Sequence, residues 1–332
     1  MTAFSVLDLV PVREGGTLEE AFAAATSLAR AAEAAGCKRF WVAEHHAMEG
    51  IAGGATAVVL AHLGNATRTI RIGSGGIMLP NHTPFQIAEQ FGTLAALFPG
   101  RVDLGLGRAP GAGPELQRAL RKDLHRAAEM FPQDVVELRA LLTGEPELAI
   151  RATPGHGAAV ELWMLGSSLF GASLAARLGL PYAFASHFAP DHLDAALALY
   201  RRDFQPSPAL SRPHVMVAMN LFTADSAAEA EYLASSQLQA FVRLRTGQPG
   251  KLPPPVANYR ATLPPPVRAM LEHIGQASAI GTPEEAAVQV RAFIARTAAD
   301  EVIFAGPTFD PAQRERALAL TMAVLADPAP AA

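Results

Sequence analysis

One short stretch of the sequence carries the residues best suited to chemistry. The apolar run Phe40 to Ala43 ends in a carboxylate and two imidazoles, Glu44-His45-His46. An imidazole has an ordinary pKa of about 6.5, so it can accept or donate a proton near neutrality. Polar groups that directly follow a buried strand either serve a site or form a satisfied pair in the core. The stretch therefore predicts an active site or a structural Glu–His pair.

The spacing of these polar residues matches no zinc signature. H-E-x-x-H is absent, and the inverted pattern H-x-x-E-H ending at His45 would need a histidine in place of Trp41. Adjacent side chains of an extended segment point to opposite sides, so only one of His45 and His46 is expected to face a common site. A mononuclear site built from His45, His187 and a distant carboxylate stays open, but we predict no metal.

Glycine-rich turns and serines were compared with two further catalytic patterns. The stretches 73–75 and 105–107 lack the last glycine of G-x-G-x-x-G, because Met78 and Pro110 occupy its position. Around Ser168, the spacing G-x-S-x-G fails at its last position, which holds phenylalanine. A dinucleotide-binding fingerprint and a serine hydrolase are therefore disfavoured.

A phosphate is the ligand that the remaining polar residues suit. Gly166-Ser167-Ser168 stands between an apolar run and a helix-like stretch, where backbone N–H groups and hydroxyls can hold an anion with help from the helix dipole. An ordinary N-cap is the equally simple alternative for the serines. Arg108 follows another apolar run and could bind the same phosphate, or form a surface ion pair.

Short apolar runs alternate with helix-like stretches along the whole chain. Eight runs have the length and composition of buried strands; they cover residues 6–10, 40–43, 70–73, 102–106, 162–165, 182–185, 215–219 and 301–305. Helices are predicted over residues 17–36, 55–66, 84–98, 115–142, 172–178, 191–200, 225–244 and 282–298, and from residue 310. We expect the third strand to break at Gly75-Gly76 and the long helix to break near Pro132. Eight strand–helix units predict a single (β/α)8 TIM barrel over residues 1–332, ahead of a doubly wound open sheet.

The alternation is interrupted after the seventh strand. Residues 225–281 read as an insertion between strand seven and its helix, and within it residues 247–266 are rich in proline and predict irregular structure. Sites of such barrels are built by the loops at the carboxyl ends of the strands. We therefore expect the insertion to cover that face and to supply walls of a substrate pocket.

Composition narrows the range of partners. The 332 residues are 50% hydrophobic and 17% charged, with a formal net charge of −4 and no block of Lys or Arg, which argues against nucleic acid and anionic membranes. The single cysteine, Cys37, excludes an internal disulfide and reads as a packed, inert thiol. No secretion signal or membrane span is visible, so we expect a cytoplasmic protein.

Taken together, several motifs resemble the luciferase-like, flavin-dependent monooxygenase family. They occur in the family's order over nearly the whole chain: Val42-Ala43-Glu44-His45-His46, Gly73-Ser74-Gly75-Gly76-Ile77-Met78-Leu79-Pro80, Leu104-Gly105-Leu106-Gly107-Arg108 and Leu165-Gly166-Ser167-Ser168, with Ala88-Glu89-Gln90, Phe98-Pro99-Gly100-Arg101 and Gly179-Leu180-Pro181. The resemblance implies a (β/α)8 barrel that uses O2 and reduced FMN. It also implies a homodimer and delivery of the flavin by a separate NAD(P)H-dependent reductase.

The resemblance also implies roles for individual residues. His45 matches the family's histidine near the reactive edge of the flavin and is the catalytic candidate, with Glu44 and His46 in support. The positions that match cofactor contacts are Ser74, Gly75, Gly76, Gly107, Arg108, Gly166, Ser167 and Ser168, and the family often has a non-proline cis peptide at the glycine pair. Gly107 replaces a cysteine of the best-known light-emitting members, which argues against light emission. Substrate-side candidates after strand ends are Met78, Phe85, His187 and Phe188.

We therefore expect a two-component monooxygenase in which reduced FMN and O2 oxidise a small organic substrate. A dehydrogenase that uses the deazaflavin F420 on the same barrel is the second enzyme hypothesis. A non-catalytic flavin-binding relative is the third hypothesis, from a different class of protein.

Overall fold

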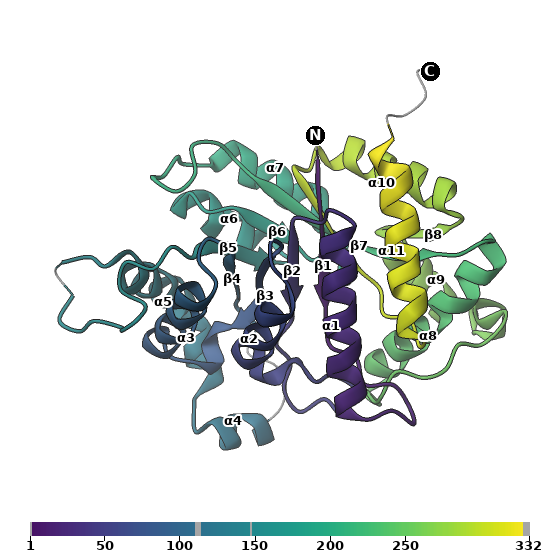
Figure 1. Ribbon diagram of the computed structural model, residues 1–332, viewed down its shortest axis with the longest axis horizontal. Coiled ribbons are helices and arrows are strands. Elements are labelled where there is room, and N and C mark those ends of the chain that lie inside the picture. Colours follow the sequence, from purple (N-terminus) through teal and green to yellow (C-terminus); the bar gives the residue numbers. More distant parts are fainter. Residues whose placement is uncertain (1, 110–113, 147, 328–332) are drawn as a thin grey trace.

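The computed structural model describes residues 2–109, 114–146 and 148–327 (Figure 1). Within them the parallel strands are β1 Ala3–Asp8, β2 Arg39–Val42, β3 Arg71–Met78, β4 Val102–Gly107, β5 Glu161–Gly166, β6 Tyr182–Phe184, β7 Val215–Thr223, β8 Ser278–Gly281 and β9 Glu301–Ala305. Their order is β6-β5-β4-β3-β2-β1-β9-β7-β8, and β6 also pairs with β7. The β6–β7 pairing closes eight strands into a barrel and leaves β8 outside. The predicted TIM barrel is confirmed.

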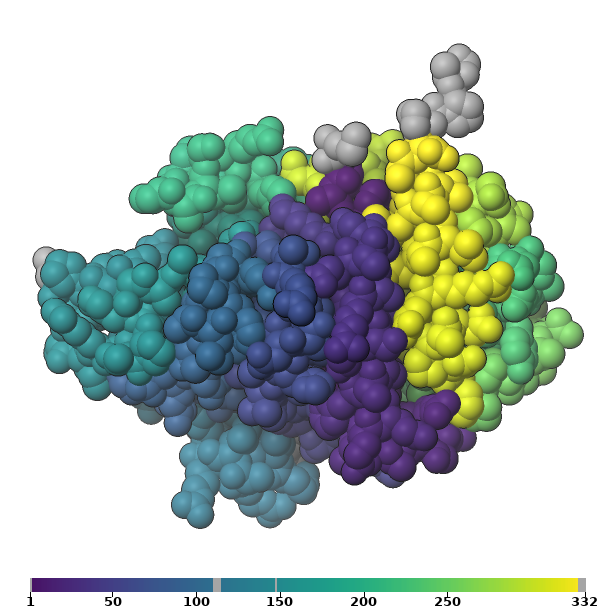
Figure 2. Space-filling view, viewed as in Figure 1, coloured from purple at the N-terminus to yellow at the C-terminus, as the bar shows by residue number. Residues whose placement is uncertain are grey.

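The helices surround the barrel. They are α1 Leu18–Ala34, α2 Thr56–Ala66, α3 Pro84–Leu97, α4 Pro114–Leu120, α5 Leu124–Thr143, α6 Leu169–Leu178, α7 Leu193–Asp203, α8 Ala227–Arg245, α9 Pro265–Gly275, α10 Pro283–Thr297 and α11 Pro311–Ala326. Capping boxes at Thr17 and Thr282 start α1 and α10 as the sequence indicates. Figure 2 shows α1 (purple) side by side with α11 (yellow) on one face. In the described ranges, every helix is too short or too polar to cross a membrane.

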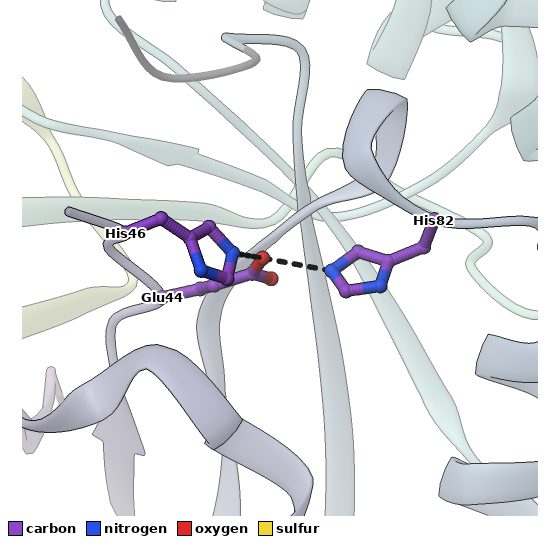
Figure 3. Close-up of side chains that lie close together, drawn as sticks. All are labelled: Glu44, His46 and His82. Carbon is purple, nitrogen blue, oxygen red and sulfur yellow. Dashed lines mark hydrogen bonds and ion pairs between the residues drawn. The ribbon is translucent and has the colours of Figure 1, made fainter. Parts of the chain in front are cut away.

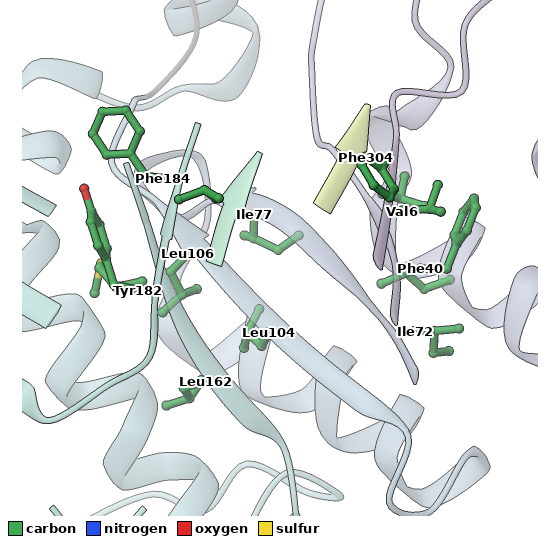
Figure 4. Close-up of a cluster of buried hydrophobic side chains, with 14 of the residues drawn as sticks. Val6, Phe40, Ile72, Ile77, Leu104, Leu106, Leu162, Tyr182, Phe184 and Phe304 are labelled. Carbon is green, nitrogen blue, oxygen red and sulfur yellow. The ribbon is translucent and has the colours of Figure 1, made fainter. Parts of the chain in front are cut away.

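Side chains alternate between the two sides of each barrel strand. Val6, Phe40, Ile72 and Leu104 point outward and pack with the helices in the main apolar core (Figure 4). Side chains of this size stabilise the fold by ~1.5–3 kcal/mol each when fully buried. The alternate positions point inward and fill the barrel, so the same strands serve both cores.

The amino-terminal end of the barrel interior is charged. Arg39 lies between three carboxylates: its guanidinium nitrogens are 2.9 Å from Asp103 Oδ2 and 3.0 Å from oxygens of both Glu161 and Glu301. The guanidinium also lies 4.6 Å from the ring centroid of Trp163. Burial disfavours ionisation of Glu301, but its partners outweigh this and lower its pKa to about 2. We call this network of Arg39, Asp103, Glu161 and Glu301, which closes the amino-terminal end of the barrel, the charged floor.

Two predicted breaks are wrong. β3 continues through Gly75-Gly76 to Met78, because β4 pairs with it again at Ile77 and Met78; pairing with β2 ends at Ser74, and the register with β4 shifts across the two glycines. Pro132 lies inside α5, whose buried Phe131 and other apolar residues hold the helix in place, and the break falls earlier, between α4 and α5. Residues 110–113, which follow β4 in the sequence and include Pro110, lie outside the described residues.

The segment 225–281 contains more regular structure than its composition predicts. It holds α8, a short 3-10 helix at Tyr259–Thr262, α9 and the strand β8, which extends the sheet by pairing with Asn220–Thr223 of β7. Within its irregular part, the N–H of Leu252 donates to the carbonyl of Val12 at 2.9 Å. The segment thereby contacts the loop that follows β1, at the carboxyl end of the barrel.

Candidate functional site

Large side chains block the middle of the barrel and small ones occupy its carboxyl end. Trp41 and Trp163 meet edge to face with 5.3 Å between ring centroids. Beyond them the inward side chains at this end include Ala183, Ala218 and Ala305. Small side chains at strand ends let a flat ligand approach the backbone, so this end of the barrel suits a planar ring.

The glycines of β3 lie against this block. A Cβ on Gly75 would stand 2.6 Å from Leu7 Cδ1, and one on Gly76 would stand 2.8 Å from the Gly105 oxygen. The expected cis peptide between the two glycines is present. The neighbouring hydroxyl of Ser74 donates to the Gly105 carbonyl and accepts from the Gly105 N–H, both at 3.0 Å, so the Ser74 side chain joins β3 to β4.

Glu44 organises a polar cluster after β2 (Figure 3). Its Oε1 atom accepts hydrogen bonds from Nε2 of His46 and from Nε2 of His82, the latter at 2.7 Å, and its Oε2 accepts from the Met78 N–H at 2.9 Å. Glu44 is 2% exposed. Burial disfavours the charged carboxylate, but the hydrogen bonds from the two histidines and Met78 lower its pKa below the ordinary value.

Sequence reasoning missed His82 in this cluster. Glu44 and His82 are 38 residues apart, and His82 precedes the Thr83 cap of α3, so no local spacing joins them. The one available signal is its position just after the glycine-rich stretch at 73–80. Lys122 Nζ donates to the carbonyls of Pro80, at 3.1 Å, and of His82, and so fixes the loop that carries the imidazole.

His45 differs from its two neighbours. It is partly buried, and its Nδ1 atom is buried without a hydrogen-bond partner among the described residues. Burial lowers the pKa of His45 below its ordinary value, so the neutral form of the imidazole predominates at pH 7. A buried polar atom without a partner carries a free-energy cost, and a bound ligand that supplies a hydrogen bond would remove it.

The predicted phosphate-binding residues meet at the start of α6. Ser168 is the N-cap of α6, but its hydroxyl makes no capping hydrogen bond. The Arg108 guanidinium lies 4.1 Å from the ring centroid of Phe170 in the first turn of α6, so the structure brings Arg108 to this helix end. Gly166 and Ser167 stand partly buried beside it. Among the described residues, a Cβ on Gly107 would meet one neighbour, the Ile77 oxygen, at 3.6 Å.

The structure scatters the substrate-side candidates. Met78 binds Glu44 through its main chain, and Phe85 packs against the outer apolar core. His187 lines a recess below α8 and α9, has an unpartnered, buried Nδ1 atom, and has a pKa lowered to about 4 by burial. Phe188 is 41% exposed and packs edge to face on Phe241 of α8. His45 and His187 join no cluster of three metal-ligating groups in the described ranges.

The closed barrel is a TIM barrel. Its polar cluster and the start of α6 lie at the carboxyl ends of the strands, which is the end that carries the site in characterised TIM-barrel enzymes. The chain matches the model of luciferase-like monooxygenases over residues 2–301. A luciferase-like monooxygenase of Escherichia coli (strain K12) is 46% identical over 323 residues, which make up 97% of this chain and 96% of the relative. The chain belongs to the luciferase-like monooxygenase family.

Other similarities are more distant. The N-acetyl-S-alkylcysteine monooxygenase of Bacillus subtilis (strain 168) is 35% identical over 254 residues, 75% of each chain. The crystal structure of apo-MsnO8 superposes with a TM-score of 0.91 at 32% identity, covering 98% of this chain and 99% of that one. The FMN complex of the oxygenating constituent of 3,6-diketocamphane monooxygenase from Pseudomonas putida (TM-score 0.69, 18% identity, 96% of each chain) and an F420-dependent secondary alcohol dehydrogenase (0.69, 16%, 98% and 99%) share the fold.

Proposed function

We propose that this protein is an FMN-dependent, two-component monooxygenase that uses reduced flavin and O2 to oxidise a small organic substrate. The observation that carries the proposal is the start of α6, where the Ser168 hydroxyl makes no capping hydrogen bond and the Arg108 guanidinium lies against the first turn. Helix N-terminal N–H groups, a free hydroxyl and a guanidinium together suit a phosphate. Ser167 would complete this cradle.

The ring of the cofactor would lie over the small residues at the end of the barrel. Gly75 and Gly76 would present bare backbone to the ring, since the places where their Cβ atoms would stand are filled by Leu7 and by the Gly105 carbonyl. The unpartnered Nδ1 of His45 would face it and regain a hydrogen bond there. Ser74 would contribute main-chain atoms only, since Gly105 engages its hydroxyl.

Reduced FMN would supply the reaction with O2, which is the chemistry of the cofactor rather than of the protein. The protein's own share is positioning and proton transfer. His45 is neutral at pH 7, so it can accept a proton at a ring nitrogen and return it. The segment 225–281 would wall the substrate pocket and exclude water, with Met78, Phe85, His187 and Phe188 on the substrate side.

The proposal includes two protein partners. A separate NAD(P)H-dependent flavin reductase would deliver the reduced cofactor, and the working assembly would be a homodimer. The resemblance of the motifs to the family supports both. Adding NADH, FMN and a generic flavin reductase to the purified protein therefore provides the assay for turnover.

Binding of oxidised and reduced FMN to the purified protein tests the cofactor. We expect micromolar affinity for at least one form, and an at least about tenfold loss in Arg108→Ala, because a charge-assisted phosphate contact is lost. Arg202→Ala is the matched control, since this exposed arginine pairs with Asp203 in the last turn of α7. Failure of both FMN forms to bind at micromolar concentration, or an equal loss in the control, would refute the proposal.

Replacement of the catalytic candidate separates the functional hypotheses. His45→Ala should fold and bind FMN but oxidise substrate far more slowly, with aldehydes, ketones and sulfur compounds as the panel to screen. Tighter binding of F420 than of FMN would instead favour the hypothesis of an F420-dependent dehydrogenase. An F420-dependent secondary alcohol dehydrogenase shares the fold of this chain. FMN binding without substrate-dependent O2 consumption across the panel would indicate a non-catalytic relative.

A further inference from the structure

Glu44 is a buried carboxylate without a fixed cationic partner. The other deeply buried carboxylates of the described residues each contact an arginine: Asp103 and Glu301 contact Arg39, and Asp8 contacts Arg314. Among the described residues, the ion-pair partners of Glu44 are His46 and His82 alone, and Lys122 contacts the main chain of His82 instead of the carboxylate. Buried charges in proteins are paired or coordinate metal ions, so a cation suits this position.

The arrangement around Glu44 also has the chemistry of a metal site. One ligand atom from each of Glu44, His46 and His82 lies within 4.8 Å of the other two, and both imidazoles approach with Nε2. The Met78 N–H donates to Oε2 of Glu44 at 2.9 Å, and carboxylates that bind metal ions commonly accept such a hydrogen bond. The other oxygen, Oε1, faces the two imidazoles.

The cluster has access for an ion. The side chains of His46 and His82 are 21% and 25% exposed, while that of Glu44 is 1% exposed. In tetrahedral coordination at about 2.1 Å, neighbouring ligand atoms stand roughly 3.4 Å apart. His82 Nε2, now 2.7 Å from Oε1, would need to withdraw by less than ~1 Å. Both imidazoles belong to loop residues outside the helices and strands, so a movement of this size breaks no helical or strand hydrogen bond.

We propose that Glu44, His46 and His82 form a binding site for one divalent transition-metal ion of the Zn²⁺ class, with water completing the coordination. Two imidazoles and a carboxylate favour Zn²⁺, Co²⁺, Ni²⁺ or Fe²⁺ over Mg²⁺ and Ca²⁺, which take mainly oxygen ligands. The ion replaces the hydrogen bonds between the imidazoles and Oε1 and neutralises the buried carboxylate. The ligands flank His45, but the proposal does not rest on the proposed flavin chemistry.

Spectroscopic titration with Co²⁺ tests the site directly. The full chain, free of any histidine tag and of FMN, is titrated with Co²⁺ while the visible d–d absorption is recorded, and Zn²⁺ is titrated by calorimetry. We expect one equivalent of each metal to bind and Zn²⁺ to displace Co²⁺. An excess of Mg²⁺ should displace neither.

Variants assign the ligands. Glu44→Gln and His82→Ala should each weaken Co²⁺ binding by more than ~100-fold, beyond the 10- to 100-fold typical of outer-shell changes. His46→Asn is the additional variant if either fails to fold, as judged by circular dichroism. His125→Ala is the matched control, because His125 faces Glu129 in an exposed pair on α5 that lacks a third ligand.

Two results would overturn the proposal. Absence of stoichiometric Co²⁺ and Zn²⁺ binding to the unmodified chain would show that the imidazoles alone satisfy the carboxylate. Binding that survives in folded Glu44→Gln and His82→Ala, or that falls equally in His125→Ala, would place the metal elsewhere.

Discussion

Two clusters of buried carboxylates, one at each end of the barrel, are neutralised in different ways. At the amino-terminal end, Asp103 and Glu301 contact Arg39, whose guanidinium keeps its charge at every pH a protein tolerates. At the carboxyl end, Glu44 contacts the imidazoles of His46 and His82 and, among the described residues, no arginine or lysine side chain. The positive charge of the Arg39 network is therefore permanent, whereas the net charge around Glu44 depends on the ligand that binds there.

This difference follows the division of labour along a TIM barrel, in which one face supplies stability and the other carries the site. It predicts that disturbing the charged floor unfolds the protein, whereas disturbing the mouth changes what the protein binds. Four changes test that division, in order of the expected effect on the free energy of unfolding.

Arg39→Met should cause the largest loss, about 3–5 kcal/mol, because it removes the most deeply buried cation of the network, although Arg71 still contacts Asp103 and Lys38 still contacts Glu301. Chemical denaturation at pH 7 measures it. Arg296→Met is the control, since Arg296 forms an exposed pair with Asp194 and should cost at most about 1 kcal/mol. Equal losses in the two variants would mean that the buried network adds nothing to stability.

Protonation of Glu301 should lower the free energy of unfolding at acidic pH. Its pKa is about 2 in the folded protein against 4.5 ordinarily, so its contribution is complete above pH 4.5 and is lost as the pH falls toward 2. The difference corresponds to about 3 kcal/mol. Unfolding measured from pH 6 to pH 2 should show a smaller acid-induced loss in Glu301→Gln, and an unchanged profile would contradict the assignment.

Glu44→Gln should cost roughly 1–3 kcal/mol, since the carboxamide still accepts one hydrogen bond but places donors beside an imidazole. The effect should be smaller than that of Arg39→Met, with the same denaturation assay as the measure. A loss as large as the arginine variant shows would give both ends of the barrel a structural role and remove the proposed division.

The smallest effect is expected at Gly107. A Cβ there would touch the Ile77 oxygen alone, at 3.6 Å, so Gly107→Ala should change stability by less than about 0.5 kcal/mol. Gly105→Ala is the contrast, because its Cβ would collide with the Ser74 carbonyl oxygen and stand 2.6 Å from Leu165 Cδ1. Thermal melting of both variants checks the difference, and similar melting points would contradict it.

Much of the fold could be predicted because strand and helix periods are local. The run Phe40 to Ala43 and the caps at Thr17 and Thr282 identify their elements without long-range information. The glycine pair Gly75-Gly76 interrupts the register with β4 but does not end the strand, because β4 pairs with β3 again at Ile77 and Met78.

The candidate site could be predicted only where one segment carries it. Glu44, His45 and His46 are contiguous, so their place after a strand was readable, but His82 reaches Glu44 from a loop 38 residues away. Likewise, composition marked residues 247–266 as irregular, yet the strand β8 nearby forms because β7 extends to Thr223 and offers it an edge.

The position of β9 has a consequence for synthesis of the chain. β9 lies between β1 and β7, so the barrel joins the first strand of the sequence to one that ends at Ala305. While the chain emerges from the ribosome, the edges of β1 and β7 lack this neighbour, and unpaired strand edges invite association between chains. A nascent chain truncated before residue 301 should therefore need a chaperone, whereas one that includes β9 can close.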